Sequence, residues 1–380
     1  MKIPFSKPYI TGHEIEYIKD IVDNGMDTAG DGKYTKLVHK WFEEKYKVPK
    51  VLLTTSCTTA LEMAVRLLNL KQGDEVIAPS FTFSSSANAI LLEKGVKIVF
   101  VDVESDTINI DPTKVEAAIT PQTKAIMVVH YAGMSCDMDK IMEIAKKNNL
   151  KVIEDAAQAV ESKYKGKYLG TIGDFGCLSF HGTKNIVAGE GGALFINSTY
   201  PEIIEMAEIL REKGTNRSKF LRGVIDKYTW VEVGGSYLPS DMLAAFLYAQ
   251  LEESEKIISL RVDAFNYYFD QLKDLEAQGK LKLPTIPEGQ EHNAHIFYIL
   301  LPNAETRDKV MTFLRSNEIG AVAHYVPLHS SPVGQKLGYK SEDLPITNQI
   351  NDRLLRLPLF SQITKEEQDF VLAKLHEVLK

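Results

Sequence analysis

The chain has 380 residues, of which 44% are hydrophobic and 25% charged, values that are ordinary for a soluble globular protein of about two domains. Its formal net charge of −7 lacks the basic excess that nucleic-acid or anionic-lipid binding requires, so we exclude these as its main role. No apolar run is long enough for a membrane helix, and the N-terminus has no signal-peptide core. The cysteines Cys57, Cys136 and Cys177 have neither metal-binding nor redox spacing, so we predict a cytoplasmic protein without a metal site.

Strand and helix patterns alternate along the first part of the chain. The predicted strands cover residues 51–55, 75–78, 97–102, 124–130 and 151–154. The predicted helices between them cover 58–69, 84–92, 111–119 and 137–148. Such alternation implies crossover connections, and therefore an α/β fold with a mostly parallel sheet.

After about residue 176 the pattern changes to short strands and longer helices. Predicted strands at 177–180 and 192–197 precede helices at 200–213 and 240–275. The last segment contains predicted strands at 295–301 and 321–326 and predicted helices at 305–317 and 364–379. We therefore predict a large α/β domain over 1–250 and a smaller α+β domain over 251–380.

Polar and aromatic residues follow several predicted strands, at the edge of a parallel sheet where ligands bind. They are Ser56–Thr59, Pro79–Phe83, His130–Tyr131, Asp155–Gln158 and His181–Asn185. Each alone has an ordinary structural interpretation. Ser56 could cap a helix with Glu62 completing a capping box, Phe83 could be a core residue, and Lys184 could be a solvated side chain.

Together these residues indicate a pyridoxal phosphate site. A helix N-terminus with hydroxyls suits a phosphate, and an aromatic ring can cover one face of the cofactor. The lysine bonds to the cofactor aldehyde, and a carboxylate keeps the pyridine nitrogen protonated. Neither a GxxxxGK[ST] nor a GxGxxG motif is present, which disfavours nucleoside triphosphate and dinucleotide sites.

Several long motifs resemble the nucleotide-sugar aminotransferases, a family of fold type I pyridoxal phosphate enzymes. The most characteristic are EDAAQA (154–159), SFHGTKN (179–185) and GEGGAL (189–194). Others are GDG (30–32), PSFTF (79–83), VHYAG (129–133), NAHIFY (293–298), HYVPLH (324–329) and LRLPLF (355–360). The resemblance implies an aspartate aminotransferase-like fold, pyridoxal 5'-phosphate as cofactor, and a homodimer whose active site is shared across the interface.

The same resemblance implies roles for individual residues. Lys184 would be the catalytic lysine, and Asp155 the partner of the pyridine nitrogen. The other implied cofactor contacts are Gln158 near the ring hydroxyl, Phe83 on the ring face, and Cys57, Thr58, Ser179 and His181 on the phosphate side. In the family, the partner subunit completes the phosphate site with the asparagine of a GxNxRxS-like motif. Here Ser236 stands at the asparagine position and Leu238 at the arginine position, so a shorter side chain with a hydroxyl replaces the amide.

Residues 211–230 resemble a subgroup that aminates C4 of dTDP-4-dehydro-6-deoxyglucose with L-glutamate for surface polysaccharide, such as O-antigen or enterobacterial common antigen. The runner-up activities are amination with the other C4 configuration or at C3. Within 217–227, a predicted loop, Arg217, Lys219, Arg222 and Lys227 form a basic cluster. This cluster is either solvated or binds the substrate's diphosphate.

Three further residues have open roles. His324, Tyr325 and His329 could be structural, could contact the sugar, or could ligate a metal, in that order of preference. Two other classes of protein remain as alternatives: a pyridoxal enzyme of different chemistry, such as a decarboxylase or cysteine desulfurase, and a non-enzymatic regulator. Retention of Lys184 and Asp155 disfavours the regulator.

Overall fold

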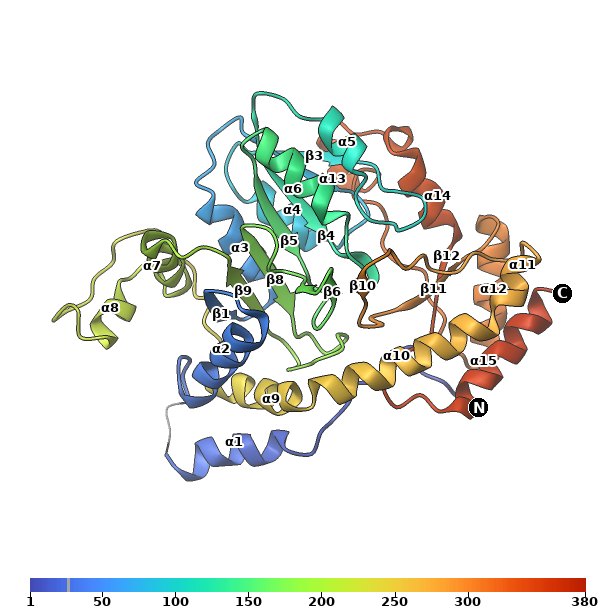
Figure 1. The fold of residues 1–380 in the computed structure, drawn as a ribbon, viewed down its shortest axis with the longest axis horizontal. Coiled ribbons are helices and arrows are strands. Elements are labelled where there is room, and N and C mark those ends of the chain that lie inside the picture. Colours follow the sequence, from blue (N-terminus) through green and yellow to red (C-terminus); the bar gives the residue numbers. More distant parts are fainter. Residues whose placement is uncertain (26–27) are drawn as a thin grey trace.

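The computed structural model describes residues 1–25 and 28–380, built around a seven-stranded sheet of order β1-β9-β8-β5-β4-β2-β3 (Figure 1). The strands are β1 (Lys50–Thr54), β2 (Glu75–Pro79), β3 (Lys97–Val101), β4 (Thr123–Val129), β5 (Lys151–Asp155), β8 (Phe175–Ser179) and β9 (Gly192–Ile196). Only β9 is antiparallel to its neighbours, β1 and β8, in this sheet. The predicted α/β class with a mostly parallel sheet is therefore confirmed.

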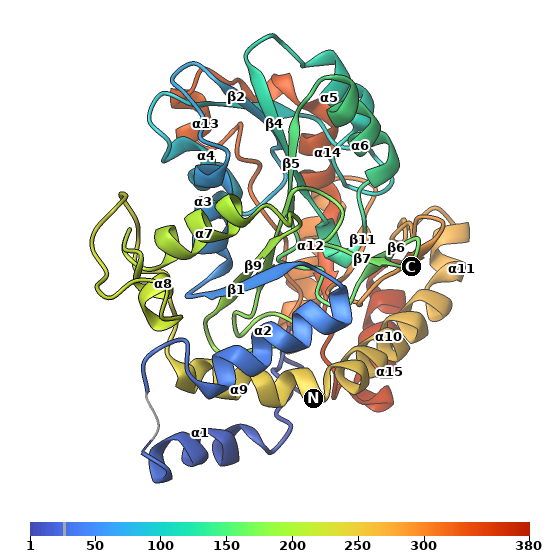
Figure 2. The same ribbon diagram turned by 60° about the vertical axis from the view of Figure 1, so that its left-hand side comes forward.

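Helices cover both faces of this sheet, because successive strand residues point to opposite sides (Figure 2). Leu52 and Met127 face the layer of α3 (Cys57–Leu67), α4 (Ser84–Leu91) and α7 (Pro201–Arg211). Leu53 and Val128 face the layer of α2 (Lys33–Tyr46), α6 (Met138–Lys147) and α9 (Asp241–Glu252). The remaining N-terminal helices are α1 (Glu14–Asp23) and α5 (Pro112–Ala117).

The helix predicted over 240–275 is three helices in the structure. The backbone leaves helical geometry at Glu253 and again at Leu272, dividing the segment into α9, α10 (Ser254–Gln271) and α11 (Lys273–Ala277). Apolar periodicity continues across both breaks, so the pattern could not locate them. As Figure 1 shows, α9 lies along the sheet whereas α10 runs on into the C-terminal part of the chain.

The C-terminal part has its own apolar cluster, which includes Phe265, Phe297, Leu314 and Val371. Its main elements are α10, β11 (Phe297–Leu300), α12 (Ala304–Ser316), β12 (Leu354–Leu357) and α15 (Lys365–Val378). The strand predicted at 321–326 is wrong, because only Val322 pairs, through an isolated bridge to Arg356. The division into 1–250 and 251–380 stays a prediction.

The other elements are short. They are β6 (Lys163–Tyr164), β7 (Lys167–Tyr168), α8 (Arg217–Leu221), β10 (Gln290–Glu291), α13 (Pro332–Lys336), α14 (Pro345–Arg353) and two 3₁₀ turns, Tyr131–Gly133 and Ser341–Asp343. Across the part of the chain that the structure describes, no helix combines the length and the apolar character needed to cross a membrane.

Candidate active site

A cavity of about 660 Å³ lies beyond the carboxyl ends of β1, β5 and β8. It is lined by most of the residues that the sequence singled out. These are Cys57, Thr58, Phe83, Asp155, Gln158, Ser179, His181, Lys184, His324 and Tyr325. The parallel sheet brings the first eight to one edge, and the C-terminal part supplies His324 and Tyr325.

Asp155 ends β5 and is buried, with 5% of its surface exposed. The Ser86 hydroxyl donates to Asp155 Oδ2 at 2.6 Å, and the Ala157 N–H donates to Oδ1 at 3.1 Å. Burial raises the pKa of Asp155, while these two hydrogen bonds and the charge of Lys184 act in the opposite direction. Ser86 was not predicted; its signal was the serine run that begins α4 directly after Phe83.

Lys184 lies in the connection between β8 and β9 and is partly buried in the pocket. Burial lowers the pKa of its ammonium group, opposed by the negative charge of Asp155. Among residues 1–25 and 28–380 no side chain or carbonyl forms a hydrogen bond or ion pair with its Nζ. The Lys184 amine is therefore available to a ligand and is more readily neutral than an ordinary lysine.

The N-terminus of α3 forms one wall of the cavity. Ser56 caps the helix by accepting the Thr59 N–H at 3.2 Å, and Thr59 completes the capping box in place of Glu62. Neither the Cys57 nor the Thr58 N–H has an acceptor among the described residues. With Ser179 at the end of β8, this helix terminus is suited to an anion. Burial raises the pKa of the Cys57 thiol, which is therefore neutral.

Another part of the cavity lining connects the sheet to the C-terminal part of the chain. Gln158 accepts the Ala132 N–H at 2.8 Å and donates to the Tyr325 hydroxyl at 2.8 Å. Tyr325 stacks on His324 with ring centroids 3.7 Å apart. Phe83 is 59% exposed, with its ring centroid 6.3 Å from that of Tyr325, so it lies at the cavity mouth rather than in the core.

Two predicted residues lie outside the cavity. His329 is fully buried, and its two ring nitrogens lie 2.7 Å from Ser80 Oγ and 3.1 Å from the Ser341 carbonyl oxygen. Its contacts are thus structural ones. Ser236 is exposed and pairs with Glu212 in an isolated bridge. Within the described part of the chain, no three acidic, histidine or cysteine side chains are grouped as metal ligands.

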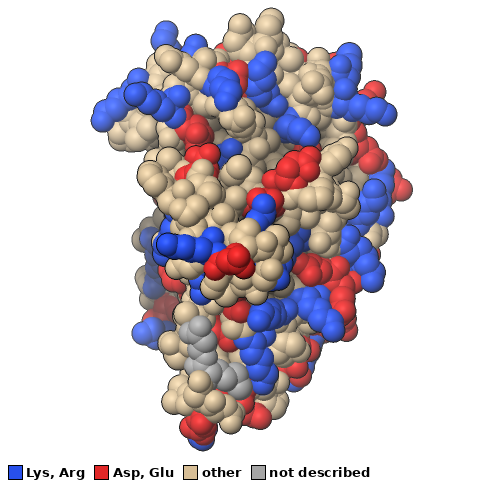
Figure 3. All heavy atoms as spheres, turned by 90° about the vertical axis from the view of Figure 1, so that its left-hand side faces the viewer, with Lys and Arg blue, Asp and Glu red and all other residues tan. Residues whose placement is uncertain are grey.

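The basic cluster is also outside the cavity of its own chain. Residues 217–221 form the short helix α8 where a loop was predicted. Arg217 pairs with Glu212 at 3.1 Å, and Arg222 donates to both carboxylate oxygens of Glu208 at 2.9 and 2.8 Å. Figure 1 shows α8 projecting from the molecule, and Figure 3 shows acidic and basic side chains interspersed on this face.

The cavity residues to which the sequence analysis gave no role include Arg261, His295 and Arg356, although the last two lie within the motifs NAHIFY and LRLPLF. Arg261 donates to the carbonyl oxygens of Ala294 at 3.0 Å and His295 at 2.7 Å. Arg356 belongs to β12, a strand the sequence did not predict. The available signal was the single charged residue inside the apolar run LLRLPLF. Because arginine is rarely buried without a partner, a charge in such a run indicates a side chain that faces a ligand site.

Comparisons with known proteins agree with this geometry. The model of the DegT/DnrJ/EryC1/StrS aminotransferase family matches residues 8–376. The GDP-perosamine synthase of Escherichia coli O157:H7 is 32% identical, covering 99% of this chain and 98% of its own. The spore coat polysaccharide biosynthesis protein SpsC of Bacillus subtilis is also 32% identical, with 100% and 97% covered. A putative sugar aminotransferase from Streptococcus pneumoniae has been solved in PMP and PLP forms. The superposition of its PMP form covers 100% of this chain and 98% of the other chain, with a TM-score of 0.92 at 27% sequence identity.

Proposed function

This chain belongs to the DegT/DnrJ/EryC1/StrS aminotransferase family of pyridoxal phosphate-dependent sugar aminotransferases, and from that premise we propose its substrates and its site residues. The reaction is transfer of the amino group of L-glutamate to the 4-keto carbon of dTDP-4-dehydro-6-deoxy-D-glucose. The products are dTDP-4-amino-4,6-dideoxy-D-galactose and 2-oxoglutarate, and the amino sugar serves surface polysaccharide synthesis. The observation that carries the proposed site is one cavity joining Lys184, Asp155 and the free N-terminus of α3.

These residues fit the cofactor. The unpartnered N–H groups of Cys57 and Thr58 suit its phosphate, as does the hydroxyl of Ser179. Asp155 is fixed by Ser86 and Ala157 and suits the pyridine nitrogen. The remaining assigned contacts are Gln158 for the ring hydroxyl, Phe83 for the ring face, and His181 beside the phosphate.

The catalytic steps of the protein centre on Lys184. The bound cofactor supplies an electron-accepting ring that stabilises negative charge on the reacting carbon. Lys184 Nζ takes the proton from Cα of glutamate and later delivers a proton to C4 of the sugar, acting as base and then as acid. Its lowered pKa keeps a larger fraction of the amine neutral for the first task. The negative charge of Asp155 would keep the pyridine nitrogen of the bound cofactor protonated.

Three findings support a nucleotide-sugar substrate. One relative is named for a GDP-sugar product and another for polysaccharide biosynthesis. His324 and Tyr325 line the cavity and offer polar contacts to a sugar, whereas we assign His329 a structural role. Residues 211–230 resemble the dTDP-sugar subgroup, and we assign Arg217 and Arg222 to the diphosphate.

The diphosphate contact requires a homodimer, because Arg217 and Arg222 lie outside the cavity of their own chain. The end of α8 and the stretch that follows it, residues 221–233, expose several large apolar side chains that a second copy could cover. They are Leu221, Val224, Trp230, Val231 and Val233. In such a dimer Ser236 of one protomer would reach the phosphate side of the other.

The test is NMR spectroscopy of the product formed by the holoenzyme from dTDP-4-dehydro-6-deoxyglucose and L-glutamate. We expect an axial amine at C4, which defines the galacto configuration. An equatorial C4 amine, a C3 amine, or no reaction with this sugar would each overturn the proposed substrate assignment.

A further inference from the structure

Tyr131 lies directly behind one wall of the active-site cavity. It begins the 3₁₀ turn after β4 and is 1% exposed, with its ring centroid 5.4 Å from that of Phe81 and 5.9 Å from that of Tyr298. Its hydroxyl oxygen lies 2.7 Å from Nδ1 of His324, a residue that lines the cavity. Tyr131 is not among the lining residues, so it can act on a bound ligand through His324.

The hydrogen bond between Tyr131 and His324 has one consistent direction. Burial, reinforced by the positive charges of Arg356 and Lys184, lowers the pKa of His324, so its ring is neutral and carries one proton. Burial raises the pKa of Tyr131, which keeps its phenol protonated. Among the described residues only His324 can accept that phenol hydrogen, and a buried donor without an acceptor is costly. Tyr131 therefore donates to Nδ1, and the ring proton of His324 resides on Nε2.

The orientation of the His324 ring is fixed by its neighbours. The ring stacks on Tyr325 with centroids 3.7 Å apart and an interplanar angle of 24°, and it lies nearly perpendicular to the Phe81 ring at 6.2 Å. Within residues 1–25 and 28–380, Nε2 forms no hydrogen bond or ion pair. The nitrogen that remains for a cavity ligand is thus a hydrogen-bond donor and not an acceptor.

The adjacent residue Tyr325 supplies a second donor. Gln158 Oε1 accepts the Ala132 N–H at 2.8 Å, and the amide nitrogen of Gln158 donates to the Tyr325 hydroxyl oxygen at 2.8 Å. The hydroxyl hydrogen of Tyr325 is left without an acceptor in the described part of the chain. Two successive residues of one turn, Tyr131 and Ala132, thereby orient two donors on the same stretch of the cavity wall.

We propose that Tyr131 is a positioning residue, which holds His324 in its neutral Nε2–H form so that this N–H donates to the keto oxygen of the acceptor sugar. This inference rests on the proposed function, which makes a keto sugar the acceptor. It goes beyond that function by giving a role to a residue behind the cavity wall and by naming the substrate atom that His324 contacts.

The chemistry of the substrate favours the keto oxygen as the partner of His324. A carbonyl oxygen only accepts hydrogen bonds, whereas a sugar hydroxyl both donates and accepts, so a nitrogen that only donates matches the carbonyl. His324 and Lys184 line the same cavity, and the charge of Lys184 acts on the His324 ring. Negative charge develops on the keto oxygen when an amine adds to the carbonyl carbon, and an N–H fixed beforehand stabilises that charge.

The first measurement locates the ring proton of His324 by ¹⁵N NMR spectroscopy of holoenzyme labelled at histidine. The signals of His324 are identified by their absence from His324→Gln. We expect the proton on Nε2 and an unprotonated, hydrogen-bonded Nδ1 in the wild-type protein, and the Nδ1 resonance should shift in Tyr131→Phe. A proton on Nδ1 of the wild-type protein would overturn the proposal, whether or not the variant folds.

The second measurement follows each half-reaction separately, by the absorbance change as the cofactor passes between its aldehyde and amine forms. For Tyr131→Phe we expect the second-order rate constant with dTDP-4-dehydro-6-deoxyglucose to fall about 3- to 10-fold, the effect of one hydrogen bond. The constant for L-glutamate should change less than about twofold, within the usual additivity error of an untouched site. Inhibition by dTDP, which has the diphosphate but no keto group, should stay unchanged.

Two further variants make the result decisive. Tyr298→Phe is the matched control, since Tyr298 is also buried and packs on Tyr131, but its hydroxyl has no hydrogen-bond partner among the described residues. It should leave both half-reactions unchanged. Tyr131→Phe combined with His324→Gln should react with the keto sugar as slowly as His324→Gln alone, because Tyr131 acts through His324.

An unchanged rate constant for the keto sugar would overturn the proposal, as would equal losses in the two half-reactions or a further loss in the double variant. Weaker inhibition by dTDP would assign His324 to the diphosphate and would also overturn it. Failure of the wild-type enzyme to aminate the keto sugar would contradict the proposed function, whereas the position of the ring proton would still decide the role of Tyr131.

Discussion

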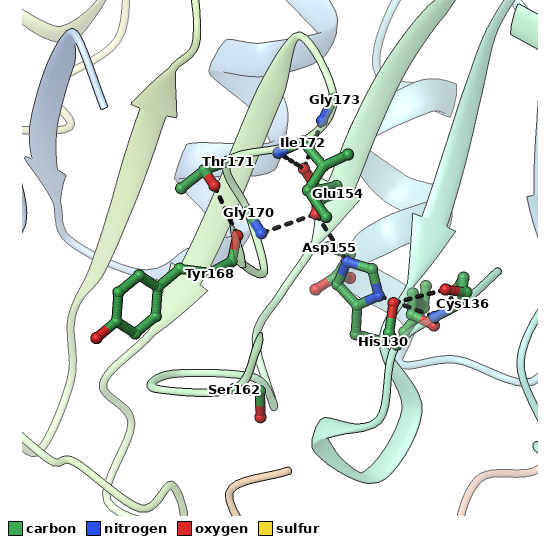
Figure 4. Close-up of polar contacts among 12 residues, drawn as sticks. His130, Cys136, Glu154, Asp155, Ser162, Tyr168, Gly170, Thr171, Ile172 and Gly173 are labelled. Carbon is green, nitrogen blue, oxygen red and sulfur yellow. Dashed lines mark hydrogen bonds and ion pairs between the residues drawn. The ribbon is translucent and has the colours of Figure 1, made fainter. Parts of the chain in front are cut away.

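His130 Nε2 lies 2.9 Å from Glu154 Oε2, and neither side chain has exposed surface. The Cys136 N–H donates to His130 Nδ1 at 3.3 Å, so the ring proton resides on Nε2 and is donated to the carboxylate. Glu154 also accepts the N–H groups of Gly170, Ile172 and Gly173 at 2.8, 2.7 and 2.6 Å (Figure 4). A neutral imidazole and one carboxylate thus connect the end of β4 to the turn before β8, directly beside Asp155.

We expect Glu154→Gln to lower the free energy of unfolding by about 2–5 kcal/mol, because the new amide NH₂ faces buried backbone N–H groups that need an acceptor. Urea denaturation of the cofactor-free protein measures the change. Glu116→Gln is the control, since Glu116 forms a solvent-exposed ion pair with Lys147, whose loss should cost less than about 1 kcal/mol. Equal stability of the two variants would contradict the assigned role of Glu154.

Asp155→Asn should make the cofactor-free protein more stable than wild type at neutral pH. Burial raises the pKa of Asp155, so the folded state binds this proton more tightly than the unfolded state does. Its contribution to stability is therefore complete below the unfolded-state pKa and is lost as pH rises through the folded-state pKa. In urea denaturation, the difference in free energy of unfolding between Asp155→Asn and wild type should grow as pH rises from the unfolded-state pKa through the folded-state pKa of Asp155.

In the same urea denaturation experiment, Asp106→Asn should change the pH dependence of stability in the opposite direction. Its ion pair with Lys282 lowers the pKa of Asp106, so the stability that Asp106 contributes is present at neutral pH and is lost as pH falls through its folded-state pKa. An Asp155→Asn protein that was less stable than wild type at neutral pH would contradict the assigned burial cost.

Lys184→Ala should reduce turnover more than about 10³-fold, since the variant lacks both the covalent attachment and the acid–base group. Steady-state formation of amino sugar checks this, and the cofactor–sugar adduct should become trappable. Lys167→Ala removes an exposed lysine of β7 and should leave turnover unchanged. Normal turnover by Lys184→Ala would refute the assignment of the catalytic lysine.

Arg217→Ala and Arg222→Ala should each raise the KM of the nucleotide sugar about 10-fold while the constants for L-glutamate stay unchanged, if these residues bind the diphosphate. Each also removes the partner of a buried glutamate, so thermal unfolding is measured in parallel. Lys213→Ala is the control from the neighbouring surface. Unchanged KM values for both arginine variants would leave these residues with a structural role only.

Much of the seven-stranded sheet and of the helices that cover it was predictable because the pattern is local. Buried strands such as 124–130 read as continuous apolar runs, and the helices between them have apolar stripes of helical period. The breaks at Glu253 and Leu272 had no such signal, since the apolar pattern does not change there. Residues 321–326 have strand-like composition, yet apart from Val322 the fold gives them no ladder partner.

The sequence by itself determined the class of fold, the family, the cofactor and the residues that follow the strands, because each of these depends on residue type and near neighbours. Only the tertiary structure decided which charges compensate one another. It paired Arg217 and Arg222 with glutamates of α7 and its C-terminus, and it enclosed His329 between Ser80 and Ser341. It also placed Arg356 on the cavity with no carboxylate partner among the described residues. Pairing depends on distances between segments far apart in the chain, and a net charge of −7 carries no information about those distances.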